Sequence, residues 1–336
     1  MLELDGSRGE GGGQILRISL AMSAITNTPF QLRRIRAGRR RPGLMRQHLT
    51  AVRAVAGACG AELEGDALGS TELTFRPGPL RGGEHTLAVG TAGSAGLVLQ
   101  ALLPALLCAP GPSTVVVSGG THNPASPPAQ FLEHALLPLL QRMGQGVLFS
   151  LEAWGFYPAG GGRYRVQLEP GRWRPLSLNT RGPVDQIELF AALSNLPDRI
   201  GHRELLTARR VLGLAPDEGE LLRVSSPGPG NVVLARLRTP QLTEVFTGFG
   251  ERGVAAEQVA RKMARQAVAW RDGTAPVGPH LADQLLVPLT LGGGSYVTGP
   301  PTAHTTTAIE VIGAFVDHAP VIEAQPDGNF RIHCSP

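Results

Sequence analysis

The same order of structural elements occurs twice in the first half of the sequence, and this repetition limits the folds that the chain can adopt. Residues 30–77 run from an extended segment through a basic, glycine-containing loop into a helix and two strands. Residues 113–171 repeat that order, with a β-branched strand, a glycine-rich loop, a helix over 128–143 and two further strands. Repeated supersecondary units normally pack side by side around a shared core, so we expect a protein built from repeats.

A second recurring pattern is a glycine turn followed by a helix. It occurs at residues 11–13, at residues 82–83 before a helix over 93–107, and at residues 292–294 before a helix over 304–316. Within the helix over 44–60, apolar side chains return every three or four residues, as they do along one buried helix face. Since helices alternate with partly paired strands, the sequence predicts a layered α/β or α+β protein.

The stretch from 179 to 272 differs from the repeats. It is more charged and carries helices of its own over 198–212 and 255–270, with strands near 231–237 and 243–248. These strands have no counterpart in the repeated segments, and the glycine–helix pattern resumes afterwards. We therefore expect a smaller inserted domain over 179–272 in a core formed by 1–178 and 273–336.

Composition indicates the number of domains and the cellular compartment that we expect for the protein. The 336 residues suffice for one large domain or two smaller ones, and 44 glycines and 28 prolines predict many tight turns. Three scattered cysteines without disulfide or metal spacing are typical of a cytoplasmic protein. No apolar run approaches the ~20 residues of a membrane helix, and the N-terminus does not resemble a signal peptide. Lysine occurs only as Lys262, and this preference for arginine indicates either phosphate binding or a codon bias.

Two segments place reactive side chains beside helix starts. In residues 9–17, glycines precede a helix whose free N–H groups suit a phosphate, with Glu10 available for a divalent metal and Arg17 for an anion. The alternative is a glycine turn with a surface carboxylate. In residues 299–308, a Gly-Pro-Pro turn delivers His304 to a helix start, whose positive end disfavours an imidazolium and leaves a nucleophilic lone pair. A purely structural histidine is the alternative there.

The densest positive charge lies in a loop without acidic residues, formed by Arg33, Arg34, Arg36, Arg39, Arg40, Arg41 and Arg46. Such a cluster suits a polyanion backbone, and a solvated basic face is the alternative. Gln47 and His48 open the following helix, where a core histidine is an alternative role for His48. In residues 278–285, Asp283 and Gln284 lie in the first turns of another helix, either as helix-stabilising groups or as ligand contacts.

Together these segments resemble the RNA 3′-terminal phosphate cyclase family along nearly the whole chain and in the same order. The matching stretches are GEGGGQILR at 9–17, IRAGR and QHL within 35–49, AGS and LVLQ within 92–106, SGGT at 118–121, GFYPAGGG at 155–162, GPGN at 228–231, LADQL at 281–285 and the segment around His304. The resemblance implies an α/β (α+β) fold of repeated units, each a small four-stranded sheet with two helices, plus a smaller inserted α/β domain.

The resemblance also implies an ATP-dependent, ligase-type enzyme that acts on RNA 3′-phosphate ends in three steps. A histidine attacks the α-phosphate of ATP and retains AMP as a phosphoramidate, while diphosphate leaves. AMP then passes to the RNA 3′-phosphate to give an RNA(3′)pp(5′)A end. The neighbouring 2′-hydroxyl attacks that end, expels AMP and forms a 2′,3′-cyclic phosphate. ATP and a divalent metal (Mg²⁺ or Mn²⁺) would be the cofactors. A monomer and a homodimer are both compatible with the sequence, and no obligate protein partner is evident.

Matched residue by residue, the resemblance assigns His304 as the nucleophile and Glu10 as the metal-binding carboxylate. The catalytic positions near the phosphates would be Arg17, Arg36, Arg39, Gln47 and His48. The nucleotide pocket would be lined by Gln100, Pro128, His280, Leu281, Ala282, Asp283 and Gln284, together with His304. This chain departs from the family by having His280 where tyrosine is common, Gln130 where aspartate is frequent and Ala308 where asparagine is common.

Two other functions are compatible with repeated units of this kind. A non-catalytic ribosome-biogenesis factor of the same fold would lack the histidine, so His304, Glu10 and the arginines together argue against it. An enolpyruvyl transferase shares the repeated architecture but has no need of a histidine after a Gly-Pro-Pro turn, and the ordered motifs would then have no explanation. We therefore expect a cyclase.

Overall fold

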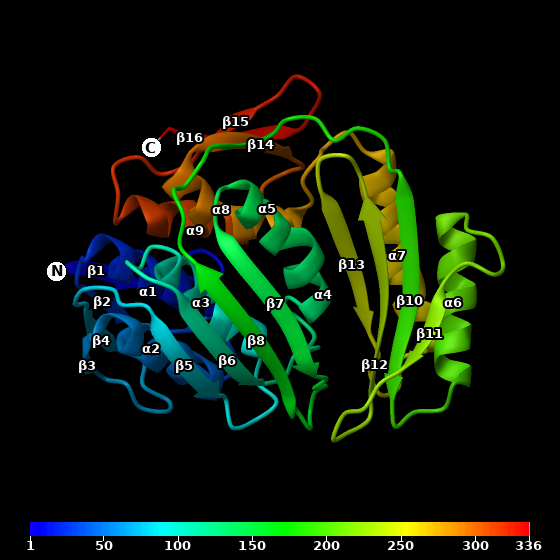
Figure 1. Ribbon diagram of the computed structural model, residues 1–336, viewed down its shortest axis with the longest axis horizontal. Helices are drawn as coiled ribbons and strands as arrows, with labels where there is room; N and C mark the ends of the chain where they lie inside the picture. The colour runs from blue at the N-terminus through cyan, green and yellow to red at the C-terminus, as the bar shows by residue number, and fades with distance from the viewer. Residues whose placement is uncertain (336) are drawn as a thin grey trace.

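The computed structural model describes residues 1–335 and contains four four-stranded sheets connected by helices (Figure 1). Three of the sheets share one topology. In each, the first two strands are parallel, the second pairs antiparallel with the fourth, and the fourth pairs antiparallel with the third. The predicted fold of repeated sheet-and-helix units is therefore confirmed.

Each repeated unit places two helical segments between its strands. Unit 1 contains β1 (Leu2–Asp5), α1 (Gln14–Thr26), β2 (Phe30–Arg33), α2 (Arg46–Cys59), β3 (Glu62–Glu64) and β4 (Leu73–Arg76). Unit 2 contains β5 (Gly83–Ala88), α3 (Ala95–Leu106), β6 (Ser113–Gly119), α4 (Ala129–Phe131), η1 (Leu132–Leu136), α5 (Leu137–Arg142), β7 (Gly146–Ala153) and β8 (Gly162–Glu169). Unit 3 contains β9 (Leu176–Leu178), α8 (Pro279–Gly292), β14 (Gly294–Thr298), α9 (Ala303–Gly313), β15 (Val321–Ala324) and β16 (Phe330–Cys334).

The repeats seen in the sequence are only the second halves of units 1 and 2. The glycine–helix pattern marks α1 and α3, which are the first helices of those units, but at its third occurrence it marks α9, a second helix. Equating the three occurrences was therefore wrong. The first half of unit 3 is hard to recognise because residues 179–278 separate the three-residue strand β9 from α8.

One predicted helix differs in detail from the structure. The helix expected over 128–143 contains a π-helical turn, η1, between α4 and α5. Pro138 is the second residue after this turn and has no N–H to donate to the preceding turn. A widened turn is a common way for a helix to accommodate such a gap.

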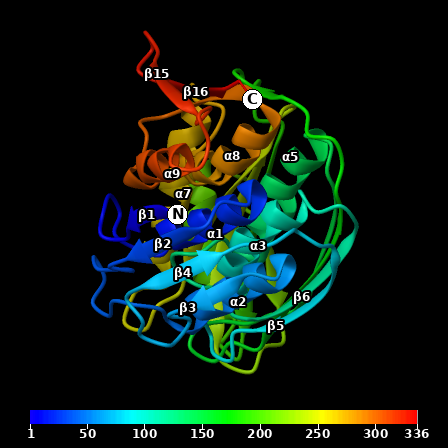
Figure 2. The ribbon, with the colours of Figure 1, turned by 90° about the vertical axis from the view of Figure 1, so that its left-hand side faces the viewer.

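The helices of the three units pack against one another at the centre, with the sheets outside. Figure 2 shows α8 and α9 above α1, and α2 and α3 below it. In agreement with this view, α1 packs against α2, α3 and α9, and α9 packs against α8. Buried apolar side chains from all three units belong to one continuous core. Residues far apart in the sequence are thereby brought together at the helix N-termini.

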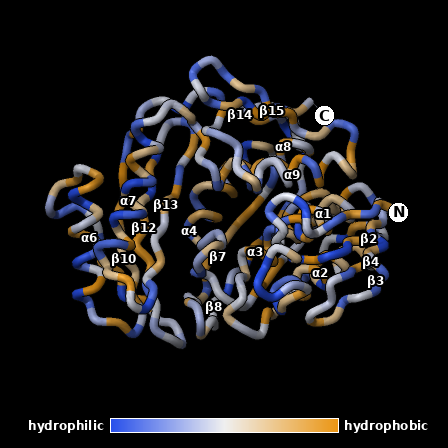
Figure 3. Tube along the Cα trace, turned by 180° about the vertical axis from the view of Figure 1, so that it is seen from behind, coloured by the Kyte–Doolittle hydropathy of each residue, from blue (hydrophilic) through white to orange (hydrophobic). Residues whose placement is uncertain are grey.

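The fourth sheet has a different strand order, β11-β10-β12-β13, and is covered by two helices. Its elements are β10 (Gln186–Ser194), α6 (Arg199–Leu212), β11 (Glu220–Arg223), β12 (Gly230–Arg238), β13 (Thr243–Phe249) and α7 (Ala256–Asp272). Hydrophobic and hydrophilic residues alternate along α6 and α7 (Figure 3), since one face of each helix packs on the sheet. The division into domains at 179 and 272 stays a prediction.

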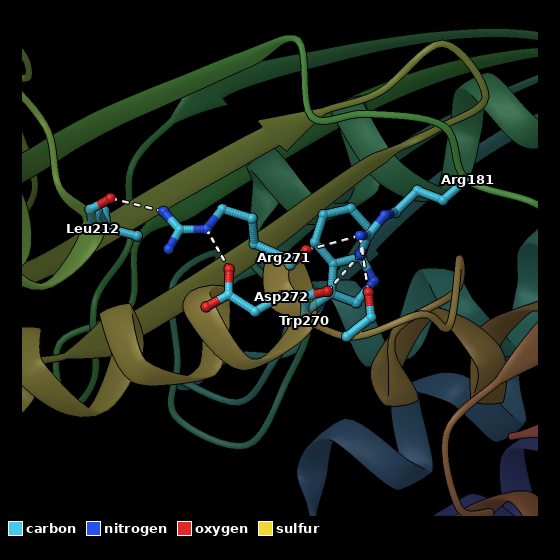
Figure 4. A network of polar contacts seen from close by, with 6 residues as sticks. Arg181, Leu212, Trp270, Arg271 and Asp272 are labelled. Atoms are coloured by element: carbon cyan, nitrogen blue, oxygen red, sulfur yellow. Dashed lines mark hydrogen bonds and ion pairs between the residues drawn. The ribbon is translucent and has the colours of Figure 1, made fainter. Parts of the chain in front are cut away.

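Arg181 lies in the segment between β9 and β10 and contacts the segment that follows α7 (Figure 4). These two segments connect the fourth sheet to unit 3. The guanidinium carbon of Arg181 lies 4.5 Å from the centre of the Trp270 ring. The same group donates hydrogen bonds to the carbonyls of Trp270, Arg271 (2.8 Å) and Gly273 (2.9 Å) at the end of α7. A planar donor fork and a cation over an aromatic face are both suited to arginine.

None of the helices within residues 1–335 is long and apolar enough to cross a membrane.

Candidate active site

His304 lies in the first turn of α9, where unit 3 meets unit 1. The hydroxyl of Thr302 accepts a hydrogen bond from the backbone N–H of Thr305 at 3.1 Å, which caps the helix and sets its start. His304 is exposed, and its Nδ1 atom lies 2.7 Å from Oε1 of Gln14, the first residue of α1. Since Gln14 is buried, it presents a firmly held partner to the imidazole.

Asp283 holds the start of α9 from the neighbouring helix α8. Its carboxylate accepts hydrogen bonds from the hydroxyls of Thr305 (2.6 Å) and Thr302 (3.2 Å). Burial raises the pKa of Asp283, while the Thr305 hydroxyl and the nearby His304 partly oppose that rise. The predicted residues His304 and Asp283 are therefore close together, and the two threonines connect them.

Arg17, Gln100 and Gln284 form a hydrogen-bonded chain across three helices from three units. Nε of Arg17 donates to Oε1 of Gln100 at 2.9 Å, and Nε2 of Gln100 donates to Oε1 of Gln284 at 2.7 Å. Burial lowers the pKa of Arg17 to about 10, so its guanidinium stays charged at neutral pH. These three residues and Asp283 line one cavity, whose remaining wall is apolar and comes from α1, α3, η1, α5, α8 and Trp173.

His48 lies beside the N-terminus of α1 and is neutral. Its Nδ1 accepts a hydrogen bond from the backbone N–H of Met45 at 3.2 Å, so Nε2 carries the proton. Burial lowers the pKa of His48 to about 3, and the charges of Arg36 and Arg17 add to the effect. A Cβ atom on Gly13 would lie only 2.7 Å from this Nε2 and 2.9 Å from Nη1 of Arg17. Glycine is thus required where these donors approach α1, an arrangement suited to an anion.

Comparison with known proteins shows the family to which the chain belongs. The family model described as RNA 3′-terminal phosphate cyclase matches residues 8–321. The chain belongs to this family. A protein named RNA 3′-terminal phosphate cyclase from Koribacter versatilis is 48% identical over 94% of this chain and 90% of its own length. Proteins of that name from Ralstonia nicotianae and Pseudomonas fluorescens are each 48% identical, over 98% and 97% of this chain and 95% of their own length. The predicted enzyme class is confirmed.

Glu10, the expected metal ligand of a cyclase, is paired with an arginine in this structure. Its carboxylate forms an ion pair with Arg39 and accepts a hydrogen bond from the backbone N–H of Gly12 at 2.8 Å. Within residues 1–335, no group of three or more histidine, cysteine, aspartate or glutamate side chains could hold a metal. One carboxylate nevertheless fits an ion such as Mg²⁺, which usually takes one or two carboxylates and completes its shell with phosphates and water.

The other residues of the basic loop have different environments. Nη1 of Arg36 donates to the carbonyls of Arg41 and Gly43, both at 2.8 Å, so this side chain holds the backbone of its own loop. Gln47 accepts a hydrogen bond from the backbone N–H of Ser94 at 2.8 Å, at the N-terminus of α3. Arg36 and Gln47 therefore shape the site while lying near His48, and Arg39 is the loop arginine that reaches Glu10.

The remaining positions expected in the nucleotide pocket are dispersed. Leu281 and Ala282 are buried in the core, so only their backbone could face a ligand. His280 is exposed in the first turn of α8, and Pro128 precedes α4. Neither lines the cavity that contains Gln100 and Asp283.

The departures from the family pattern and the unpredicted contacts can also be placed. Oε1 of Gln130 lies within hydrogen-bond distance of Nε2 of His122, at 2.8 Å, and Ala308 is fully buried.

Gln14, Thr302 and Thr305 were not predicted as site residues. Gln14 lies within the quoted motif at 9–17, and a threonine just before a helix is a recognisable cap. The partner of Gln14, however, comes from another unit, and the partner of both threonines, Asp283, comes from another helix of the same unit, so no local pattern indicates these contacts.

Proposed function

We propose that the chain converts an RNA 3′-terminal phosphate into a 2′,3′-cyclic phosphate at the expense of ATP, with His304 as the AMP carrier. The observation that carries this proposal is the contact between Nδ1 of His304 and Oε1 of Gln14. Because an amide oxygen can only accept, Nδ1 carries the proton and Nε2 of the neutral ring has a free lone pair. That lone pair is the nucleophile that the reaction needs.

In the first step, Nε2 of His304 forms a bond to the α-phosphorus of ATP, and the bond to the bridging oxygen breaks with release of diphosphate. The guanidinium of Arg17 and the Nε2–H of His48, which both approach Gly13 beside Gln14, would stabilise the charge on the transferring group. Gln100, Asp283 and Gln284 would contact the nucleoside from their shared cavity. Glu10 would hold a divalent metal together with the phosphates, and that ion would neutralise phosphate charge.

In the second step, an oxygen of the RNA 3′-phosphate attacks the phosphorus of the adenylate and the bond to Nε2 breaks. In the third, the 2′-hydroxyl oxygen attacks the 3′-phosphorus, loses its proton and expels AMP. Arg39 lies at the edge of the site, is half-exposed, and would bind the incoming RNA phosphate once it leaves Glu10. The basic loop around it suits the RNA backbone.

Labelling with radioactive ATP tests the covalent step. Incubation with α-labelled ATP and Mg²⁺ or Mn²⁺ is expected to give an acid-labile labelled protein, and γ-labelled ATP is expected to give none. The label should be absent in His304→Ala and present in His202→Ala, a change of an exposed histidine on α6. A wild-type protein that never becomes labelled would refute the mechanism. Conversion of a 3′-phosphate oligonucleotide to a phosphatase-resistant end measures the complete reaction.

A further inference from the structure

A second cavity lies between unit 2 and the fourth sheet, and it shares no residue with the cavity beside Asp283. Its volume is about 860 Å³, within the ~300–1,000 Å³ typical of small-ligand pockets. Its lining residues include Pro158 and Gly230, which lie near the starts of β8 and β12. Both strands start at the lower edge of Figure 1. The walls of the cavity come from the loops after β6 and β7, from the start of α6 and from the β13–α7 connection.

The two walls of this cavity are in close contact where they meet. A Cβ atom on Gly230, at the start of β12, would lie only 2.2 Å from the Phe156 ring of the opposite wall. Glycine is therefore needed for this approach. Phe156 in turn lies against Trp154 and His122, which are stacked with their ring centres 4.1 Å apart. These contacts set the shape of the cavity.

The rim of the cavity carries an exposed aromatic ring. Tyr157 follows Phe156 in the chain. It carries a large aromatic ring, yet the residue is 67% exposed. A flat, exposed ring at the mouth of a pocket suits stacking on another flat ring, and aromatic side chains hold the bases of single-stranded nucleic acids in this way.

The floor of the cavity carries a buried carboxyl group with an unused oxygen. Glu204 is fully buried, and its Oε1 accepts a hydrogen bond from Nδ2 of Asn231 at 2.5 Å. Its Oε2 has no hydrogen-bond partner among the residues that the structure describes. The adjacent Arg203 does not pair with it, because that side chain binds Glu257 through two contacts of 2.7 Å. A buried polar atom without a partner is costly, and an N–H group of a ligand would satisfy it.

The mouth of the cavity carries one exposed arginine that is available to a phosphate group, beside a carboxylate of opposite charge. Arg252 is exposed on the rim and forms no ion pair within residues 1–335, while the neighbouring Glu251 carries the opposing charge. The cavity is also linked to the candidate active site through one segment. His122 lines the cavity and bonds Gln130, and Gln130 lies two residues after Pro128 of the expected nucleotide pocket.

We propose that this second cavity binds a base of the RNA strand upstream of the reacting 3′ end. The base stacks on Tyr157, one of its N–H groups is donated to Oε2 of Glu204, and Arg252 binds a flanking phosphate. This inference rests on the proposed function, because it assumes that the strand entering the site is RNA. It adds a subsite that holds the strand while its end reacts.

Binding of an unreactive strand tests the subsite without catalysis. A fluorescent ten-nucleotide RNA ending in a 3′-hydroxyl is titrated with the wild type and with Tyr157→Ala, and anisotropy gives Kd. We expect Kd to rise about tenfold in Tyr157→Ala, in line with the loss of one stacked base, and to stay unchanged in Tyr157→Phe, which keeps the ring. Equal affinity of Tyr157→Ala and wild type would overturn the proposal.

Two further measurements separate this proposal from the proposed function. Protein labelling by α-labelled ATP should be the same in Tyr157→Ala as in the wild type; a raised ATP requirement would instead make the cavity an adenosine site and overturn the RNA assignment. Cross-linking of RNAs with 4-thiouridine at successive upstream positions should join one position to the peptide that contains Tyr157, and cross-links confined to other peptides would also overturn it. RNA binding that depends on Tyr157 in a protein that ATP never labels would refute the histidine mechanism and leave the subsite standing.

Discussion

Nδ1 of His304 lies 2.7 Å from Oε1 of Gln14, across the boundary between the third and the first repeated unit. The two residues are the early positions of two different helices, and Gln14 is buried while His304 is exposed. A hydrogen bond to one ring nitrogen sets which tautomer the imidazole adopts and how the ring is oriented. We therefore propose that Gln14 is a positioning residue, which holds the proton of His304 on Nδ1 and leaves Nε2 unprotonated.

Replacement of Gln14 tests this role. Gln14→Ala should slow protein labelling by α-labelled ATP about tenfold, since a hydrogen bond contributes ~1 kcal/mol and the wrong tautomer is unreactive. Gln14→Glu should shift the pH–rate profile of labelling upward, because a carboxylate favours the protonated imidazolium. Initial labelling rates across a pH series measure both effects. Gln31→Ala, a change of a glutamine on β2 outside the site, is the control. Wild-type rates in Gln14→Ala would contradict the assignment.

The ion pair between Glu10 and Arg39 leads to a second prediction. Arg39→Ala should lower the rate of RNA end modification at least tenfold while protein labelling by ATP continues, because the arginine is assigned to the RNA phosphate and Glu10 stays available for the metal. Glu10→Gln should instead raise the metal concentration needed for labelling. Metal titrations of both reactions separate the two cases. Arg40→Ala, an exposed neighbour in the same loop, should have little effect. A loss of labelling in Arg39→Ala would refute this division of roles.

The repeated fold could be predicted from the sequence where elements are local. The helix expected over 44–60 is α2, which begins at Arg46 and ends at Cys59, since its apolar spacing directly records one buried face. β8 shows strict alternation of buried and exposed residues, which is the signal of a strand with one face on the core. β10 was not predicted, because its second half is buried on both faces and shows no alternation.

The residues of the candidate site could be picked out from the sequence motifs, but their contacts with one another could not. Residue types such as His304 and Arg17 stand out in glycine-rich segments, and the structure brings them to neighbouring helix starts. Which groups neutralise or hold the site residues depends on tertiary contacts between separate loops and helices, such as the ion pair of Arg39 with Glu10 and the hydrogen bond of Thr305 to Asp283. Local periodicity carries no information on pairings across so many residues.

Arg181 should stabilise the connection between the fourth sheet and unit 3. Arg181→Ala removes three hydrogen bonds and the contact with Trp270, so we expect the free energy of unfolding to fall by about 1–3 kcal/mol. Arg181→Lys should recover only part of the loss, since an ammonium lacks the planar donor fork. Urea unfolding curves measure the change, with Arg172→Ala, an exposed arginine, as the control. Equal stability of Arg181→Ala and wild type would show that the network is dispensable.

The buried carboxyl of Glu244 should make stability depend on pH. Glu244 lies on β13, and its Oε1 accepts a hydrogen bond from the backbone N–H of Gly278 at 2.6 Å, at the start of α8. Burial raises the pKa of Glu244 to about 8, above the 4.5 of a free glutamate. Between these pH values the folded state binds more protons than the unfolded state, so the stability present at low pH is lost as the pH rises to 8.

Glu244→Gln keeps the acceptor for Gly278 and removes this titration. We expect the variant and the wild type to be similar in stability at pH 5, and the variant to be more stable at pH 8.5 by a few kcal/mol, on the order of the pKa difference. Glu204, whose pKa burial raises to about 7, contributes a loss of the same sign in both proteins and cancels in the comparison. Urea midpoints at the two pH values measure the difference. Stability curves that stay parallel from pH 5 to pH 8.5 would show that Glu244 titrates as an ordinary carboxyl. A charge on this buried side chain would then not destabilise the fold.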